Sequence, residues 1–247
     1  MLKPLEYAYF ATAIVNLMAV TALGSNAASP DNQTWQMLHY ISKPLLMIIL
    51  ILFYATSIVR KPNSFHKMMI AAFFFSWIGD VALMFVHVNE NFFLVGLVGF
   101  LITHILYTIV FSKVNQPEVA PILPKKFWVA VPLVIYMVAL LSMLVPAITG
   151  NDKTKPFLVP VLVYSTAIAI MVLFSINRFR RVGDSSFALV FGGALLFMFS
   201  DSLIAINKFM TPLPLAGFFI MILYITGQWL IAKGALKQHP PREQEAH

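Results

Sequence analysis

The chain has 247 residues, of which 60% are hydrophobic and 11% are charged, and its mean hydropathy is +0.82. Soluble domains carry about 25% charged residues, so this composition is typical of a protein embedded in lipid. The net charge of +7 does not indicate nucleic-acid binding, because the basic residues lie in short loops between apolar segments and no RNA-binding signature, phosphate loop or zinc spacing occurs. Without cysteine there is no disulfide, thiolate nucleophile or Cys-ligated metal.

Apolar runs of about 20 residues, the length that crosses a bilayer, alternate with turn-forming or charged segments. They predict an all-α membrane protein with eight transmembrane helices, at residues 5–23, 38–58, 67–87, 92–111, 127–147, 157–174, 187–206 and 214–233. These spans occupy most of the chain. We therefore expect a single integral membrane domain over residues 1–236 and a short polar cytoplasmic tail over 237–247.

Basic residues orient a multi-pass protein, because loops rich in lysine and arginine stay in the cytoplasm. Thirteen fall on one side of the predicted spans: Lys3, Arg60, Lys61, Lys67, Lys113, Lys125, Lys126, Arg178, Arg180, Arg181, Lys233, Lys237 and Arg242. Three fall on the other side: Lys153, Lys155 and Lys208. We expect both termini in the cytoplasm and a location in a bacterial cytoplasmic membrane.

The first span has one alternative interpretation. Lys3, the apolar stretch and the small-residue segment ALGSNAAS resemble a cleaved signal peptide. Glu6 and an apolar run of about 19 residues favour a retained helix instead. Cleavage would leave the topology of the other seven helices unchanged.

A faint internal repeat relates the two halves of the chain. Asp80 and Asp201 are 121 residues apart, and the same offset pairs Lys43 with Tyr164, Arg60 with Arg181, Ser64 with Ser185 and Gly96 with Gly217. The chain would then consist of two parallel four-helix repeats. In that arrangement Asp80 and Asp201 are equivalent and face each other across a pseudo-axis.

The two aspartates are the strongest functional signal. Asp80 lies in FFFSWIGDVALMF and Asp201 in GGALLFMFSDSLIAI, near the middle of predicted spans. A carboxylate at mid-bilayer costs roughly 2.5 kcal/mol or more, so it marks a functional site by default. The structural alternative is a network with Lys43 or Tyr164 that holds the bundle together.

Other polar residues fall at similar depth and are expected to turn inward, because lipid offers them no partner. His104 and Tyr107 share one helix face, as do Tyr224 and Gln228. The full set of supporting residues is Lys43, His104, Tyr107, Tyr164, Ser202, Asn207, Tyr224 and Gln228. They predict a polar cavity, open toward the outer half of the membrane, with both carboxylates on its wall.

Each of these residues also has a structural interpretation. Lys43 can extend to the interface, His104 can join helices by a hydrogen bond, and the tyrosines and Gln228 can serve packing. Glycines at 96, 99, 192 and 193 are interpreted as close helix contacts. His104 is the only histidine well inside a predicted span, so no metal site and no cofactor are expected.

Several ordered motifs resemble the YhhN-like lysoplasmalogenase family. They are Lys43-Pro44, GDVALM at 79–84, GLVGFLITHILY at 96–107, SDSLIAINKF at 200–209 and YITGQWLI at 224–231. Each motif alone is weak, whereas the ordered set covers nearly the whole chain and is specific. Gly227 departs from the family pattern, in which alanine is expected.

The resemblance implies an integral membrane hydrolase that cleaves the vinyl-ether bond of a lysoplasmalogen. Its products would be a fatty aldehyde and glycerophospho-ethanolamine or -choline, and Asp80 and Asp201 would occupy the family's paired acidic positions. The implied partners are a lysophospholipid substrate and membrane lipid, without nucleic acid. Headgroup preference and oligomeric state stay open.

Vinyl-ether hydrolysis suits a carboxyl pair. Proton transfer to the outer alkene carbon produces an oxocarbenium ion, to which water adds, and the hemiacetal then breaks into aldehyde and alcohol. One carboxyl must be protonated and the other ionised, as in glycosidases. Which aspartate is the acid stays open. Lys43 would favour an ionised aspartate or bind the phosphate, while His104, Tyr107 and Tyr164 would bind the glycerol oxygen or position water.

Two other functions compete with the hydrolase. A proton-coupled transporter or channel would use two intramembrane aspartates on equivalent helices as a proton relay, although no predicted span is broken at mid-depth by paired glycine and proline. A lipid-binding or scaffold protein would use them for stability alone.

Overall fold

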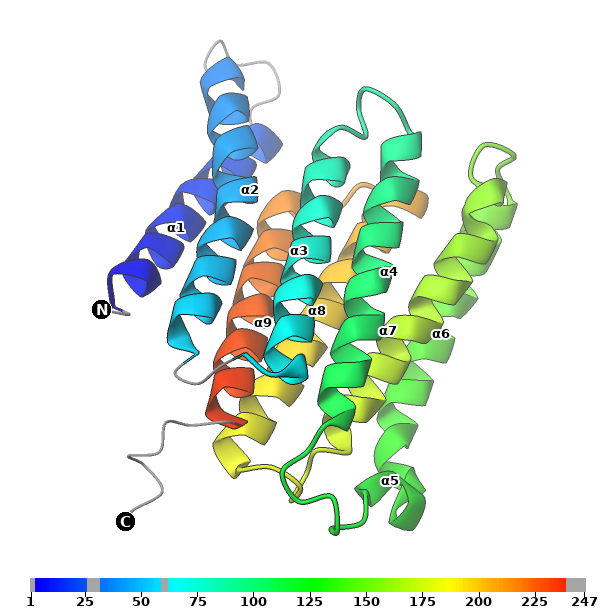
Figure 1. The fold of residues 1–247 in the computed structure, drawn as a ribbon. Helices are drawn as coiled ribbons and strands as arrows, with labels where there is room; N and C mark the ends of the chain where they lie inside the picture. Colours follow the sequence, from blue (N-terminus) through cyan, green and yellow to red (C-terminus); the bar gives the residue numbers. More distant parts are fainter. Residues whose placement is uncertain (1–2, 26–31, 59–61, 239–247) are drawn as a thin grey trace.

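The computed structural model of the protein describes residues 3–25, 32–58 and 62–238, and all regular structure within them is helical (Figure 1). The long helices are α1 Lys3–Ser25, α2 Asn32–Ser57, α3 Ser64–Met84, α4 Asn91–Ser112, α6 Val131–Thr149, α7 Leu158–Ile176, α8 Asp184–Phe209 and α9 Ala216–Gln238. Short elements connect some of them: α5 Ile122–Lys125 and the 3-10 turns η1 Phe127–Ala130 and η2 Lys155–Phe157.

Eight helices in the described part of the chain are long and apolar enough to cross a membrane, which confirms the predicted all-α class and its order of spans. The boundaries differ where polar residues add turns. The helix α2 begins at Asn32, six residues before the predicted span. The helix α3 begins at Ser64 because the side chain of Asn63 accepts a hydrogen bond from the backbone N–H of His66.

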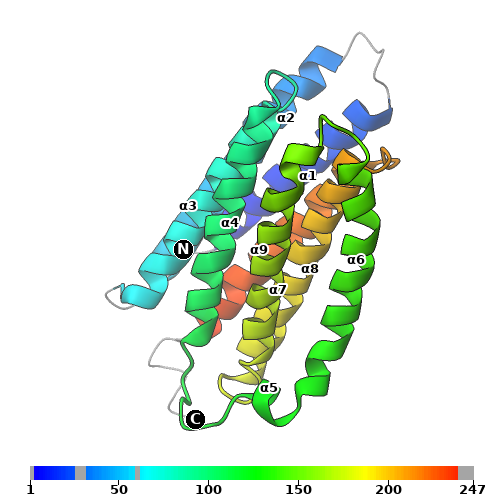
Figure 2. The ribbon, with the colours of Figure 1, turned by 90° about the vertical axis from the view of Figure 1, so that its right-hand side faces the viewer.

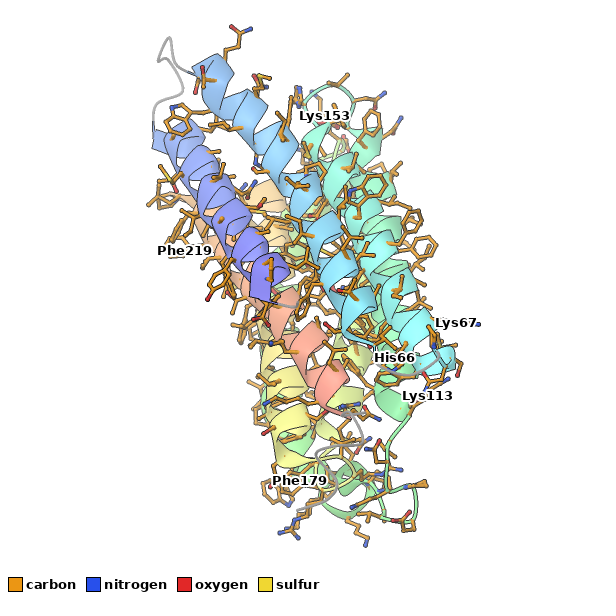
Figure 3. All side chains as sticks on the ribbon, turned by 60° about the vertical axis from the view of Figure 1, so that its left-hand side comes forward. His66, Lys67, Lys113, Lys153, Phe179 and Phe219 are labelled. Carbon is orange, nitrogen blue, oxygen red and sulfur yellow. The ribbon has the colours of Figure 1, made fainter. Side chains whose placement is uncertain are left out.

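The helices form one bundle in which sequence neighbours pack as antiparallel hairpins. The tightest pairs are α3 with α4 and α8 with α9, and α4 packs on α7 across the two halves (Figures 1 and 2). Figure 3 places Lys153 at one end of the bundle and Lys67, Lys113 and Phe179 at the other. The chain is thus an integral multi-pass membrane protein, and its orientation across the membrane stays a prediction. Arg60, Lys61, Arg242 and the tail from residue 239 lie outside the described residues.

The first helix belongs to the packed bundle. Tyr9 of α1 is buried, and its hydroxyl donates a hydrogen bond to the carbonyl oxygen of Ile225 in α9 over 2.9 Å. Lys233 of α9 pairs with Glu6, the acidic residue of the first α1 turn, over 2.5 Å. These contacts favour a retained helix over a cleaved signal peptide.

Small residues allow the close helix crossings. A Cβ atom built on Gly193 of α8 would lie 2.6 Å from the carbonyl oxygen of Gly227 in α9. A Cβ on Gly227 would in turn lie 2.9 Å from the carbonyl oxygen of Gly193, so glycine rather than alanine suits this position. Gly96 and Gly99 make the equivalent close approach between α3 and α4, as predicted, whereas Gly192 does not: its nearest neighbour would be 3.9 Å away.

Adjacent glycines therefore provide a matched test of the α8–α9 crossing. We expect Gly193→Ala to lower the unfolding free energy of the detergent-solubilised protein by about 1–3 kcal/mol, because the added methyl forces the backbones apart. Gly192→Ala meets only ordinary contact and gains helix propensity, so its melting temperature should equal or exceed that of the parent. Equal melting temperatures for the two variants would contradict the close crossing.

Candidate active site

Asp80 lies in a buried polar cluster formed by three helices. The carboxylate, on α3, is 2% exposed. The Lys43 ammonium of α2 lies 3.7 Å from its Oδ1 atom, and the Tyr224 hydroxyl of α9 donates a hydrogen bond to Oδ2 over 2.6 Å. Lys43 lies eleven residues inside α2, and its ammonium pairs with Asp80 instead of reaching the interface.

Asp201 lies in a second polar cluster, formed by α4, α7 and α8. The Tyr164 hydroxyl donates a hydrogen bond of 2.5 Å to Asp201 Oδ2. The His104 Nε2 atom lies 3.1 Å from the same oxygen and 2.9 Å from the Tyr164 hydroxyl. In the Nε2–H tautomer the imidazole donates to both oxygens, and its Nδ1 atom faces the Met171 sulfur at 3.3 Å. Two donors thus converge on one carboxyl oxygen.

The two clusters occupy repeat-equivalent positions. The Lys43–Asp80 and Tyr164–Asp201 contacts join residues separated by the same 37 positions, one pair in each half of the chain. The 121-residue offset therefore relates contacts as well as residue types, although one aspartate pairs with an ammonium and the other with a phenol.

A third buried network lies where the halves meet. The Tyr107 hydroxyl donates to Gln228 Oε1 over 2.5 Å, and these residues are themselves 121 positions apart. Equivalent residues that contact each other lie at the pseudo-axis of the repeat. Gln228 Nε2 donates to the Ser76 hydroxyl over 2.9 Å, and Ser76 donates to Thr103 over 3.2 Å. All four side chains are fully buried, so this network joins α3, α4 and α9.

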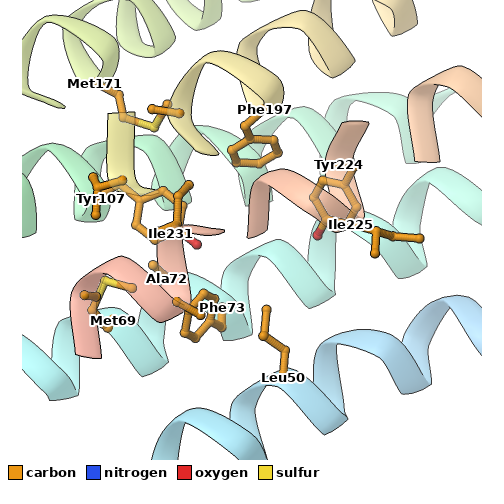
Figure 4. Close-up of a cluster of buried hydrophobic side chains, with 14 of the residues drawn as sticks. Leu50, Met69, Ala72, Phe73, Tyr107, Met171, Phe197, Tyr224, Ile225 and Ile231 are labelled. Carbon is orange, nitrogen blue, oxygen red and sulfur yellow. The ribbon is translucent and has the colours of Figure 1, made fainter. Parts of the chain in front are cut away.

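Aromatic rings separate the two aspartate clusters. The Phe197 ring centroid lies 5.4 Å from that of Tyr224, the Asp80 partner, and 4.9 Å from that of His104, the Asp201 partner. The Phe100 ring packs against Tyr224 at 5.9 Å. Figure 4 shows Phe197 and Tyr224 within the apolar core. The aspartates are thus held in neighbouring clusters rather than in one shared polar chamber.

One cavity reaches the second cluster. It encloses about 50 Å³, room for a few waters at about 10–15 Å³ each. We call it the Asp201 cavity, and its lining consists of Leu83, Phe93, Leu97, Phe100, Met137, Leu140, Leu144, Val161, Tyr164, Ser165, Ile168, Met198, Asp201, Ser202, Ile204, Ala205 and Phe209. The prediction of a polar cavity with both carboxylates on its wall is wrong in two respects: the lining is mainly apolar, and Asp80 is not part of it. Of the predicted polar residues, Tyr164 and Ser202 line the cavity with Asp201, and the others do not.

The last two predicted site residues are Ser202, which lies on the cavity wall, and Asn207, which lies away from it. Ser202 lines the Asp201 cavity, and its hydroxyl donates to the Met198 carbonyl within α8 over 2.8 Å. Asn207 does not line the cavity. Its side-chain oxygen accepts a hydrogen bond of 2.8 Å from the Leu213 backbone N–H, so it stabilises the connection between α8 and α9.

Some buried polar residues were missed by the sequence analysis. Ser76 lies four residues before Asp80 on the same α3 face, and Thr103 lies four residues before Tyr107 on one face of α4, which are signals that a periodicity search finds. Arg178, counted only as a basic loop residue, is fully buried between α7 and α8. Its Nη2 donates to Ser186 over 3.0 Å, and burial lowers the pKa of the Arg178 guanidinium to about 10, so it stays charged at neutral pH.

The Lys43–Asp80 ion pair predicts how two variants change thermal stability. Lys43→Met removes the ammonium and leaves a buried carboxylate without its counter-charge, which costs about 3–5 kcal/mol when a buried pair is broken. Adding Asp80→Asn removes the uncompensated charge, so the double variant should recover most of the lost melting temperature. Thermal unfolding in detergent measures both. Additive losses in the double variant would contradict the ion pair.

The sequence profile of the YhhN family matches residues 38–235 of the chain. Among characterised relatives, bovine lysoplasmalogenase TMEM86A is 31% identical over 172 residues, which cover 68% of this chain and 65% of the relative. Human lysoplasmalogenase TMEM86A is 30% identical over 176 residues, with the same coverage of each chain. The matched region thus spans just under two thirds of the length of these relatives. No solved structure matches the chain.

Proposed function

Because the chain belongs to the YhhN family, we propose that it is a membrane-embedded lysoplasmalogenase. It would hydrolyse the vinyl-ether bond of lysoplasmenyl-ethanolamine or -choline to a fatty aldehyde and the glycerophospho-base. Relatives named lysoplasmalogenase support the proposal. The observation that carries it is a carboxyl group, Asp201, on the wall of an apolar cavity within a membrane span, held by Tyr164 and His104.

The geometry favours Asp201 as the proton donor. The hydrogen bonds from Tyr164 and His104 both end on Oδ2, which leaves Oδ1 to carry the acidic proton that we propose Asp201 donates. Transfer of that proton to the outer alkene carbon forms a C–H bond and leaves the positive charge on the ether carbon and oxygen. The Asp201 carboxylate then lies beside the oxocarbenium ion and stabilises it.

Water completes the reaction. A water molecule attacks the carbon of the oxocarbenium ion and gives a proton to the Asp201 carboxylate, as the acid–base residue of a retaining glycosidase does. The hemiacetal hydroxyl then gives up its proton as its carbon's bond to the glycerol oxygen breaks; the glycerol oxygen takes up a proton in exchange, and the carbonyl of the aldehyde forms. The Asp201 cavity has room for this water, and Ser202 on the same wall is proposed to position it.

Asp80 is proposed as the second, ionised carboxylate. Its contact with the Lys43 ammonium suits the ionised form. Its other partner, Tyr224, packs against the rings of Phe100 and Phe197. Phe100 lines the Asp201 cavity, and Phe197 packs against His104. From there its charge would act on the oxocarbenium ion at longer range than Asp201. Tyr107 and Gln228 are proposed to hold α4 and α9 in register around both clusters.

The Asp201→Asn variant tests the proton donor. An amide keeps the size and the hydrogen-bond acceptor but has no acidic proton, so aldehyde release from lysoplasmenyl-ethanolamine should fall by about 10²–10⁴-fold. The melting temperature in detergent should change little. Asp184→Asn is the matched control, because Asp184 is exposed in the first turn of the same helix, and it should retain parent activity.

Saturated-ether and acyl analogues should release no aldehyde from either protein. Near-normal turnover by Asp201→Asn would overturn the mechanism. Absence of aldehyde release from a well-folded parent, together with substrate counterflow in proteoliposomes, would instead support the transporter.

A comparison of single and double variants separates the two roles of Asp80. Asp80→Asn removes the carboxylate but leaves Lys43 buried without its partner, so lost activity alone does not distinguish chemistry from folding. Adding Lys43→Met relieves the unpaired charge. If Asp80 contributes its charge to catalysis, the double variant regains thermal stability but stays at least about tenfold below parent kcat. Parent-like kcat in the double variant would show that Asp80 serves stability alone.

A further inference from the structure

The helix α6 stands at the edge of the bundle (Figure 2). Only 17% of its span is buried, against 56% for α9. Its main helix neighbours are α7 and α8, the two helices that carry Tyr164 and Asp201. The Asp201 carboxyl group therefore lies on a cavity that is lined in part by α6, and α6 is the least buried of the eight spans in the described part of the chain.

An apolar groove lies beneath this helix. Its volume is about 560 Å³, within the range of about 300–1,000 Å³ that small-molecule sites occupy. We call it the α6 groove, and its lining consists of Ile122, Val129, Pro132, Leu133, Tyr136, Val172, Ile176, Phe179, Phe187, Phe191, Leu195, Met198 and Phe199. Tyr136 contributes the single hydroxyl of this set, so the groove suits a hydrocarbon.

The α6 groove and the Asp201 cavity meet at the candidate active site. Met198 lines both of them and lies three residues, about one helical turn, before Asp201. Along α8 the groove extends from Phe187 to Phe199, about 18 Å at 1.5 Å per residue. A chain that lies in the groove therefore points one end at Asp201.

The opposite end of the Asp201 cavity carries a cation. The Lys208 ammonium lies 5.5 Å from the centre of the Phe93 ring, and Phe93 lines the cavity. Lys208 lies seven residues beyond Asp201 on α8, about 10 Å along the helix. An ammonium attracts a phosphate. The groove, the carboxyl and the cation thus lie in that order along one helix.

We propose that the α6 groove binds the single hydrocarbon chain of the lysolipid substrate, with the reactive ether at Asp201 and the phosphate toward Lys208. This inference rests on the proposed function and adds the orientation of the substrate. The Asp201 cavity is too small for the whole lipid, so the hydrocarbon chain needs the adjoining α6 groove. A single groove receives one chain, which favours lysolipids over two-chain lipids.

Chain-length dependence tests the groove. Val129 lines it near the end far from Asp201, whereas Val134 of α6 is 55% exposed and is not part of the lining. We expect Val129→Trp to reduce kcat/KM by about tenfold or more for a hexadecenyl substrate, because several methylenes lose their burial. An octenyl substrate ends before the added ring and should be turned over as by the parent. Val134→Trp should leave the parent profile for both chains.

Labelling of the unmodified protein gives an independent test. A saturated-ether lysophosphoethanolamine with a diazirine at the end of its chain is not hydrolysed and reports where the chain ends. Peptide mapping should find the label on groove residues such as Ile176 and Phe187, and excess unlabelled lysolipid should remove it. Label spread over the lipid-facing surfaces of α1 and α2, without competition, would overturn the proposal.

The two tests distinguish the two proposals. Competed labelling of the groove by a protein that releases no aldehyde supports the chain site and rejects the reaction. Aldehyde release by the parent, with an unchanged chain-length profile in Val129→Trp, rejects the groove and keeps the reaction. If Val129→Trp does not fold, the labelling pattern decides.

Discussion

A carboxylate inside a bilayer must find its partners within the protein, and this constraint organises the structure. Asp80 and Asp201 are each satisfied by donors from two other helices. Because these donors come from α2 and α9 in one case and from α4 and α7 in the other, the two clusters connect six of the eight spans. Lipid offers no alternative donors, so separating these helices would expose an unsatisfied charge or carboxyl group.

Close backbone contact holds the two helical hairpins together. The α3–α4 and α8–α9 hairpins cross at glycines whose missing side chains let the backbones touch. Each aspartate lies on one helix of such a hairpin, and its hydrogen-bond donors lie on helices outside it: Tyr224 on α9 for Asp80, and His104 on α4 for Asp201. The Tyr107–Gln228 hydrogen bond at the pseudo-axis then joins the two hairpins to each other.

The bundle also divides into a tightly packed part and a looser part. The Asp80 cluster lies among α2, α3 and α9, where side chains are densely buried. The Asp201 cluster faces a cavity that meets a groove, and α6 lines both of them. This asymmetry between repeat-equivalent positions gives a physical basis for the different roles that we propose: one aspartate paired with a lysine, and one on the wall of a cavity that meets the α6 groove.

Much of this protein is determined by its sequence alone. The eight spans follow from apolar run length, because a bilayer requires about 20 apolar residues per helix, and Asp80 and Asp201 stand out because charge is costly there. The repeat offset pairs Lys43 with Tyr164, and each of them contacts one of these aspartates. What the tertiary structure decided is which polar residues share a cluster. The rotation of each helix about its own axis and the size of the Phe100 and Phe197 rings set that arrangement. Neither can be recognised from the spacing of residues in the sequence. The expected polar chamber is therefore two clusters separated by aromatic rings, with Asp201 alone on a cavity wall and Asn207 in a loop contact.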